Sequence, residues 1–156
     1  MSEVREPVDP DVDLRAAPEP VRVLPVLGAV SLGGALGAAA RYAALLAWPA
    51  SGAGFPWALF GINVVGSGLI GVLMVLVVES GLRVHPLVRP FLGVGVLGGF
   101  TSFSTYAMDL SGLLARGELL TAVGYLLGTL AGALGAVWAG AVLTRRLYRA
   151  SEGRTG

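Results

Sequence analysis

Four long apolar stretches separated by short polar connections dominate the pattern along this chain of 156 residues. Each reaches or approaches the ~20 residues that an α-helix needs to cross a hydrocarbon core of roughly 30 Å. The pattern therefore predicts an all-α membrane protein with one domain, residues 25–145, made of four transmembrane helices. The four stretches run from about Pro25 to Trp48, Trp57 to Val78, Pro90 to Met108, and Leu119 to Thr144.

The two ends of the chain differ from this domain. Residues 1–24 contain six acidic residues, three arginines and four prolines. Such a segment cannot bury enough apolar surface to offset its ordering entropy, so we expect a disordered acidic tail. It lacks the basic start and apolar run of a signal peptide, and the first apolar stretch is therefore expected to remain as a spanning helix. Residues 146–156 form a short basic tail.

Charge is scarce and unevenly placed. Only 13% of the residues are charged, and the mean hydropathy is +0.75. Four spans put both termini and the loop 79–89 on one side, and short cytoplasmic loops are enriched in arginine. This side carries most of the arginines, so we expect a multi-pass protein of the bacterial plasma membrane with cytoplasmic termini. The arginines on this side are Arg15, Arg22, Arg83, Arg89, Arg145, Arg146, Arg149 and Arg154.

The sequence also argues against several kinds of chemistry. There is no cysteine, no cluster of metal ligands and no basic cluster, so we expect neither an enzyme nor a partner that is a nucleic acid. Proton-coupled transporters usually place a carboxylate or an imidazole inside the membrane. Here Glu79 and Asp109 are predicted at helix ends, and His85 is predicted in a loop.

The most polar part of any span is Gly98–Tyr106, which holds two glycines, four hydroxyl residues and three aromatic residues. Glycine weakens a helix by roughly 1 kcal/mol per residue, and serine and threonine hydroxyls bond to nearby carbonyls. We predict a break in the third helix, where freed carbonyls bind cations and freed N–H groups bind anions. A bent helix that merely packs its aromatic residues is the alternative interpretation.

Three further polar features lie on the other spans. Asn63 and Ser67 share a helix face, either as hydrogen-bond donors to a ligand or as an interhelical contact. Tyr125 and Thr129 share a face of the fourth helix, either as a polar track or as ordinary bundle contacts. Arg41 is either a snorkelling side chain or a cation that concentrates anions at the mouth of a vestibule.

Glycines recur at the spacing typical of close helix packing. They are Gly33 and Gly37 on the first span and Gly124, Gly128 and Gly132 on the fourth.

Three motifs, taken in order, resemble those of the Fluc/CrcB family of fluoride channels, over about residues 25–145. The resemblance implies a passive channel that exports cytoplasmic fluoride, built as an antiparallel dual-topology dimer with two pores and a structural Na⁺ at its centre. The motifs are Gly33-Gly34-x-x-Gly37-x-x-x-Arg41-Tyr42, Gly61-x-Asn63-x-x-Gly66-Ser67 and Gly98-Gly99-Phe100-Thr101-Ser102-Phe103-Ser104-Thr105-Tyr106.

The resemblance also implies roles for single residues. Arg41 would line the vestibule, Asn63 would donate hydrogen bonds to fluoride, and the carbonyls of Gly98 and Thr101 would bind the Na⁺. Phe103 matches one of two pore phenylalanines, whereas Tyr106 stands where the family has the second. The pore-side hydroxyls would be those of Ser104, Thr105, Tyr125 and Thr129.

The charge asymmetry bears on the partner subunit. Members of the family that form homodimers insert in both orientations, which requires nearly balanced loop charges. This chain is biased to one orientation, so we expect a homologous sibling inserted the other way, with self-association as the alternative. Two rival functions are a small multidrug-type cation exporter, which needs a carboxylate in its first helix, and a non-transporting membrane assembly subunit.

Overall fold

The computed structural model describes residues 23–49, 54–79 and 84–152. Within these ranges every regular element is a helix, as predicted, and four spans are long and apolar enough to cross a membrane. The predicted acidic tail lies outside the described residues except for its last two positions, which are helical. The spans are Val23–Ala47, Trp57–Glu79, Pro90–Ala115 and Leu119–Ala150.

Seven helical elements make up these spans. The first span is α1 (Val23–Ala47), and the second is α2 (Trp57–Met74) followed by the π-helical η1 (Val75–Glu79). The third consists of η2 (Pro90–Leu97), α3 (Gly98–Phe100) and α4 (Phe103–Ala115). The fourth is α5 (Leu119–Glu152), whose 34 residues extend over about 51 Å at roughly 1.5 Å per residue.

The prediction that Asp109 ends the third helix is wrong. Asp109 lies inside α4, which continues for six more residues to Ala115. The Tyr125 hydroxyl donates a hydrogen bond to Asp109 Oδ2 over 3.4 Å, so a neighbouring helix partners this carboxylate within the span. Helix α5 also runs beyond the predicted Thr144, so that residues 146–152 of the predicted basic tail are helical.

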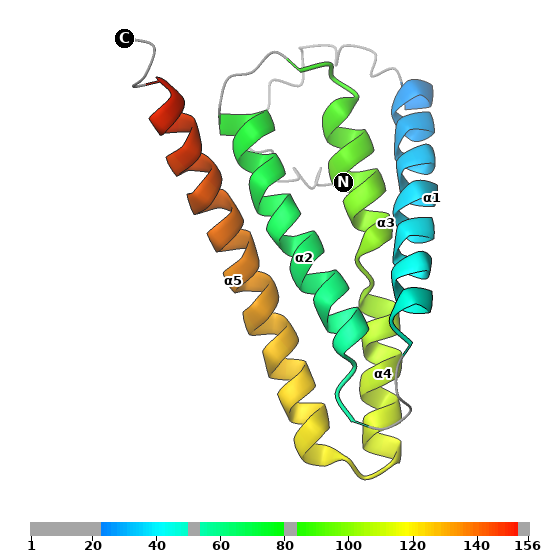
Figure 1. Cartoon of the computed structure of the whole chain (residues 1–156). Coiled ribbons are helices and arrows are strands. Elements are labelled where there is room, and N and C mark those ends of the chain that lie inside the picture. The colour runs from blue at the N-terminus through cyan, green and yellow to red at the C-terminus, as the bar shows by residue number, and fades with distance from the viewer. Residues whose placement is uncertain (1–22, 50–53, 80–83, 153–156) are drawn as a thin grey trace, which may run out of the picture.

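The helices pack in two tight pairs, α1 with η2–α3 and α2 with α5 (Figure 1). The predicted close packing at Gly33 and Gly37 is confirmed, because a Cβ at either position would collide with a backbone carbonyl of η2. On α5 the closest approach is at Gly140, whose Cβ position meets the carbonyl of Gly68. Gly124 has open space at its Cβ position within the described residues, so the prediction of close packing fails there.

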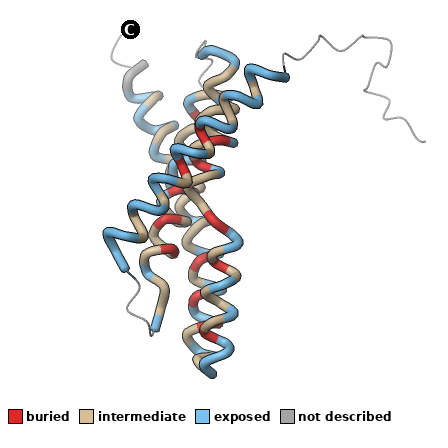
Figure 2. Tube along the Cα trace, turned by 90° about the vertical axis from the view of Figure 1, so that its right-hand side faces the viewer, coloured by how far each residue is buried: buried red, intermediate tan, exposed pale blue. Residues whose placement is uncertain are grey.

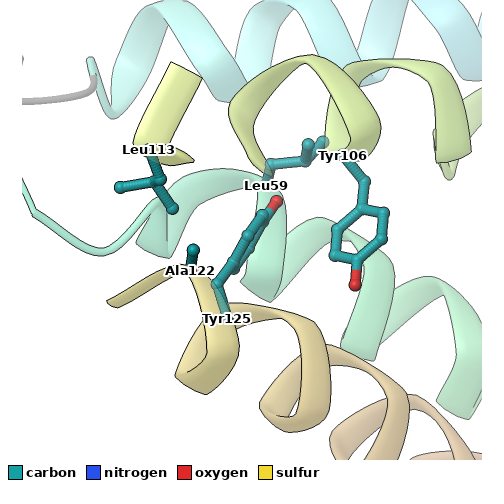
Figure 3. Packing of buried hydrophobic residues seen from close by; sticks show 5 residues of the cluster. All are labelled: Leu59, Tyr106, Leu113, Ala122 and Tyr125. Atoms are coloured by element: carbon teal, nitrogen blue, oxygen red, sulfur yellow. The ribbon is translucent and has the colours of Figure 1, made fainter. Parts of the chain in front are cut away.

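Most positions on α1 and α5 are exposed, and exposed positions, in pale blue, recur along the trace in Figure 2. These exposed positions are rich in leucine, as expected for helices in contact with lipid. A small buried cluster joins the first turns of α2 and α5 to α4 (Figure 3). Its members are Leu59, Tyr106, Leu113, Ala122 and Tyr125.

Candidate polar site between α2, α4 and α5

The third span is interrupted by two residues in an extended conformation. Thr101 has φ −76° and ψ 156°, and Ser102 has φ −148° and ψ 113°. In a continuous helix the Ser102 N–H would bond to the carbonyl of Gly98. Instead it donates to Asn63 Oδ1 over 2.9 Å. At the interruption the Ser102 N–H therefore bonds to a side chain of α2 and not to the Gly98 carbonyl.

Ser102 also caps the start of α4. Its Oγ accepts the Thr105 N–H over 3.1 Å and donates to Thr105 Oγ1 over 2.8 Å. The Ser104 hydroxyl lies 3.3 Å from the same Oγ. An N-cap serine of this kind satisfies one of the free N–H groups of the first helical turn. Ser102, Ser104 and Thr105 form what we call the hydroxyl cluster.

Two polar side chains from the first two spans reach the interruption. The guanidinium of Arg41 donates from Nη1 to the Thr101 carbonyl over 2.9 Å. Asn63 Nδ2 donates a longer bond, 3.4 Å, to the Ser102 carbonyl. Arg41 therefore contacts the backbone of the third span.

A pocket of about 420 Å³ opens beside the interruption. The Thr129 side chain lines it and is only 8% exposed, yet its hydroxyl has no hydrogen-bond partner among the described residues. Buried hydroxyls are nearly always paired, so a buried hydroxyl without a partner on a residue that lines the pocket is unusual. The lining residues are Asn63, Ser67, Ile70, Thr101, Ser102, Phe103, Tyr106, Leu126, Thr129, Leu130 and Ala133.

Aromatic rings follow one another from the pocket into the buried cluster. The Phe103 and Tyr106 centroids are 5.8 Å apart, and those of Tyr106 and Tyr125 are 5.0 Å apart. Phe103 is 81% exposed, whereas Tyr106 and Tyr125 are buried together (Figure 3). The Tyr106 hydroxyl donates to the Leu126 carbonyl of α5 over 3.3 Å.

The structure brings most of the predicted site residues together. Asn63, Thr101, Phe103, Tyr106 and Thr129 line the pocket, and Tyr125 lies against Tyr106.

The other predicted residues are not among those that line the pocket. Ser104 and Thr105 belong to the hydroxyl cluster. Gly98 lies four residues before Ser102, on α3. The sequence placed Ser102 in the predicted break but gave it no role in the site, although a serine at a helix start is the usual sign of an N-cap.

Comparison with known proteins identifies the family. Residues 28–141 match the family described as "CrcB-like protein, Camphor Resistance (CrcB)". The chain belongs to the CrcB family. The matched range runs from α1 into α5 and includes the whole of the polar site.

Several curated CrcB relatives are similar over most of their length. The chain is 54% identical over 125 residues to "Fluoride-specific ion channel FluC 1" of Streptomyces coelicolor, covering 80% of each protein. It is 52% identical to "Fluoride-specific ion channel FluC 2" of Nocardia farcinica, covering 76% of this chain and 86% of the relative. It is 43% identical to "Fluoride-specific ion channel FluC" of Chlorobaculum tepidum, covering 74% and 91%.

Proposed function

We propose that this CrcB-family protein is a passive, fluoride-selective ion channel that exports cytoplasmic fluoride. The names of its relatives support fluoride as the ion. The observation that carries the proposal for this chain is Thr129, which lines the pocket within a span and whose buried hydroxyl has no hydrogen-bond partner among the described residues. A buried donor that no protein group uses is suited to an ion that must exchange its water for protein hydrogen bonds.

The groups around the pocket suit a small, strongly hydrated anion. Desolvating such an ion costs tens of kcal/mol as an idealised Born estimate. Asn63 and Thr129 offer neutral donors, and the edge of the Phe103 ring carries positive quadrupole density. Weak donors spread along a path allow the ion to enter and also to leave, whereas one buried positive charge would trap it.

The backbone at the interruption fits a cation as well. The Gly98 carbonyl does not accept the Ser102 N–H, and the Thr101 carbonyl accepts one bond, from Arg41, which leaves its second lone pair for a cation. Carbonyls of unwound transmembrane helices are the usual ligands of Na⁺ in transport proteins. We therefore propose that Gly98 and Thr101 hold a structural Na⁺, which when bound supplies positive potential beside the anion path.

The proposal includes an antiparallel partner subunit. Phe103 is 81% exposed on a single protomer, and the pocket opens to one side, so the path needs a second chain to close it. Among the described arginines, Arg89 directly precedes η2, and Arg145, Arg146 and Arg149 lie near the C-terminal end of α5. These two helix ends lie at the same end of the bundle (Figure 1), where Arg145 forms an ion pair with Glu79. We propose a homologous sibling of opposite orientation in the bacterial plasma membrane, with the termini of this chain in the cytoplasm.

Orientation reporters test this assembly. Reporters fused to both termini of this chain should give one orientation when it is expressed alone. Co-expression with the sibling should then produce a stable heterodimer. Equal populations of the two orientations for this chain alone would favour a homodimer.

Liposomes test the function itself. Vesicles that carry the assembled complex, loaded with fluoride, should release it without ATP or a proton gradient, and a fluoride electrode follows the release. Matched vesicles loaded with chloride should keep their contents. If vesicles retain their fluoride although the complex is shown to be inserted, the proposed function is contradicted.

A further inference from the structure

A single peptide group, the one between Thr101 and Ser102, is held from both sides by side chains of other spans. Its carbonyl accepts from Arg41 on α1, and its N–H donates to Asn63 on α2, each over 2.9 Å. We propose that Arg41 and Asn63 together clamp this peptide, and that Arg41 is a positioning residue for the hydroxyl cluster. Arg41 then acts through the backbone, and its main role is not to concentrate anions at a vestibule mouth.

The packing of α1 explains how Arg41 reaches this peptide. Gly33, Gly37 and Arg41 follow one another at intervals of four, so they lie along one stripe of the helix. A Cβ at Gly33 would collide with the Phe91 carbonyl, and one at Gly37 would lie 2.8 Å from the Phe100 nitrogen. The stripe therefore runs along η2 and α3 in backbone contact. Its next member, Arg41, comes beside the third span at the point where α3 ends.

The chemistry of the clamp suits its position. The last carbonyls of a helix carry negative partial charge, and a cation there is stabilising. A bond from a guanidinium to a carbonyl is charge-assisted and roughly twice as strong as a neutral one. On the α2 side, the Asn63 side-chain amide takes the place of a backbone peptide group. It accepts from the Ser102 N–H and donates to the Ser102 carbonyl.

The clamp has a direct consequence for the pocket. The Oγ of Ser102 organises Thr105 and contacts Ser104, so the position of the Ser102 backbone sets the position of all three hydroxyls. Phe103 follows directly and begins α4. Loss of the clamp would therefore displace the hydroxyls and the ring together.

Isotope labelling isolates this peptide, because Thr-Ser occurs only at residues 101 and 102 of the sequence. In full-length protein labelled with carbonyl-¹³C threonine and ¹⁵N serine, only this peptide contains a directly bonded ¹³C–¹⁵N pair. Its NMR signal reports the carbonyl and the nitrogen separately. We expect Arg41→Gln to move the carbonyl resonance upfield, and Asn63→Leu to move mainly the nitrogen.

Matched variants complete the NMR experiment. Arg116→Gln removes a charge from an arginine that pairs with Glu118, away from the interruption, and should leave both resonances in place. Arg41→Lys keeps the charge but loses the planar guanidinium, so it should move the carbonyl resonance in a measurable but smaller way, which keeps the test open if Arg41→Gln does not fold. A carbonyl resonance that stays unchanged in the Arg41 variants that fold would overturn the clamp.

A transport measurement separates the two roles of Arg41, and this arm alone rests on the proposed function. In 1 M salt the Debye length falls to about 3 Å, so a solvated mouth charge is screened. We expect Arg41→Gln to slow fluoride efflux about tenfold in both low and high salt, the scale of one lost charge-assisted hydrogen bond. A defect that vanishes in 1 M salt would assign Arg41 to the mouth. A wild-type channel without fluoride flux would refute the function but leave the NMR result standing.

Discussion

The two sides of the interrupted third span are built in opposite ways. On the α1 side, glycines bring backbones into contact and leave no room for a Cβ at Gly37. On the side of α2 and α5, hydroxyl and aromatic side chains surround a pocket of about 420 Å³. The difference indicates that the α1 side packs closely against the backbone, whereas the other side, apart from the contact made by Asn63, leaves space for a ligand.

The largest effect is expected on the open side, from Asn63→Asp. The aspartate keeps an oxygen that can accept the Ser102 N–H, but it loses both amide donors and adds a negative charge beside the pocket. An unpaired buried charge costs roughly 3–5 kcal/mol, so fluoride efflux from liposomes should fall by at least about 100-fold. Efflux at the wild-type rate would remove Asn63 from the path and leave only its contact with the backbone.

On the closed side, Gly37→Ala tests the backbone contact. The added methyl group would overlap the Val96 carbonyl, and overpacking of this kind costs typically 1–3 kcal/mol or more. We expect a lower melting temperature in detergent, although alanine raises helix propensity. Gly34→Ala is the matched control on the same helix, because its Cβ position is open and the methyl group should be tolerated. Equal melting temperatures for the two variants would mean that α1 does not pack as described.

Phe103→Ile sharpens the account of the open side. The substitution keeps apolar bulk at an exposed position but removes the ring edge. Edge interactions of aromatic rings are worth about 0.5–1.5 kcal/mol, so efflux should fall up to about tenfold, with little change in melting temperature. If the variant conducts like wild type, ring chemistry does not contribute to the path.

The smallest effect on efflux is expected from Tyr106→Phe, which introduces the phenylalanine that the family resemblance implies at this position. The hydroxyl donates to the Leu126 carbonyl over 3.3 Å, so it is already engaged. One such bond contributes about 1 kcal/mol, and we expect a slightly lower melting temperature with efflux within about threefold of wild type. A large gain in flux would show instead that this hydroxyl obstructs the path.

Much of the fold follows from hydropathy. The starts of the second, third and fourth spans at Trp57, Pro90 and Leu119 match the predicted ones, because each follows a proline or a polar turn. The misjudged end at Asp109 has a tertiary cause. A charge normally ends a span, but here a tyrosine from another helix partners it, and no local pattern shows that contact.

The residues of the site were easier to predict from the sequence than the hydrogen bonds between them. Residue types and motif order pointed to Asn63, Phe103 and Thr129. The bonds from Arg41 to Thr101 and from Asn63 to Ser102 span 60 and 39 residues, and they depend on how the helices pack. The spacing of Gly33, Gly37 and Arg41 was visible in the sequence. That it brings Arg41 to the Thr101 carbonyl could be seen only once the glycines were found to face η2 and α3.

The lone hydroxyl of Thr129 has a consequence for how such a protein evolves. A buried hydroxyl without a partner lowers stability by about 1–3 kcal/mol relative to a bonded one, and valine has nearly the same shape. Selection for heat resistance alone would therefore replace Thr129 with valine, which would give a more stable protein with slower fluoride transport. The persistence of threonine in a lineage would then report continued exposure to the ion.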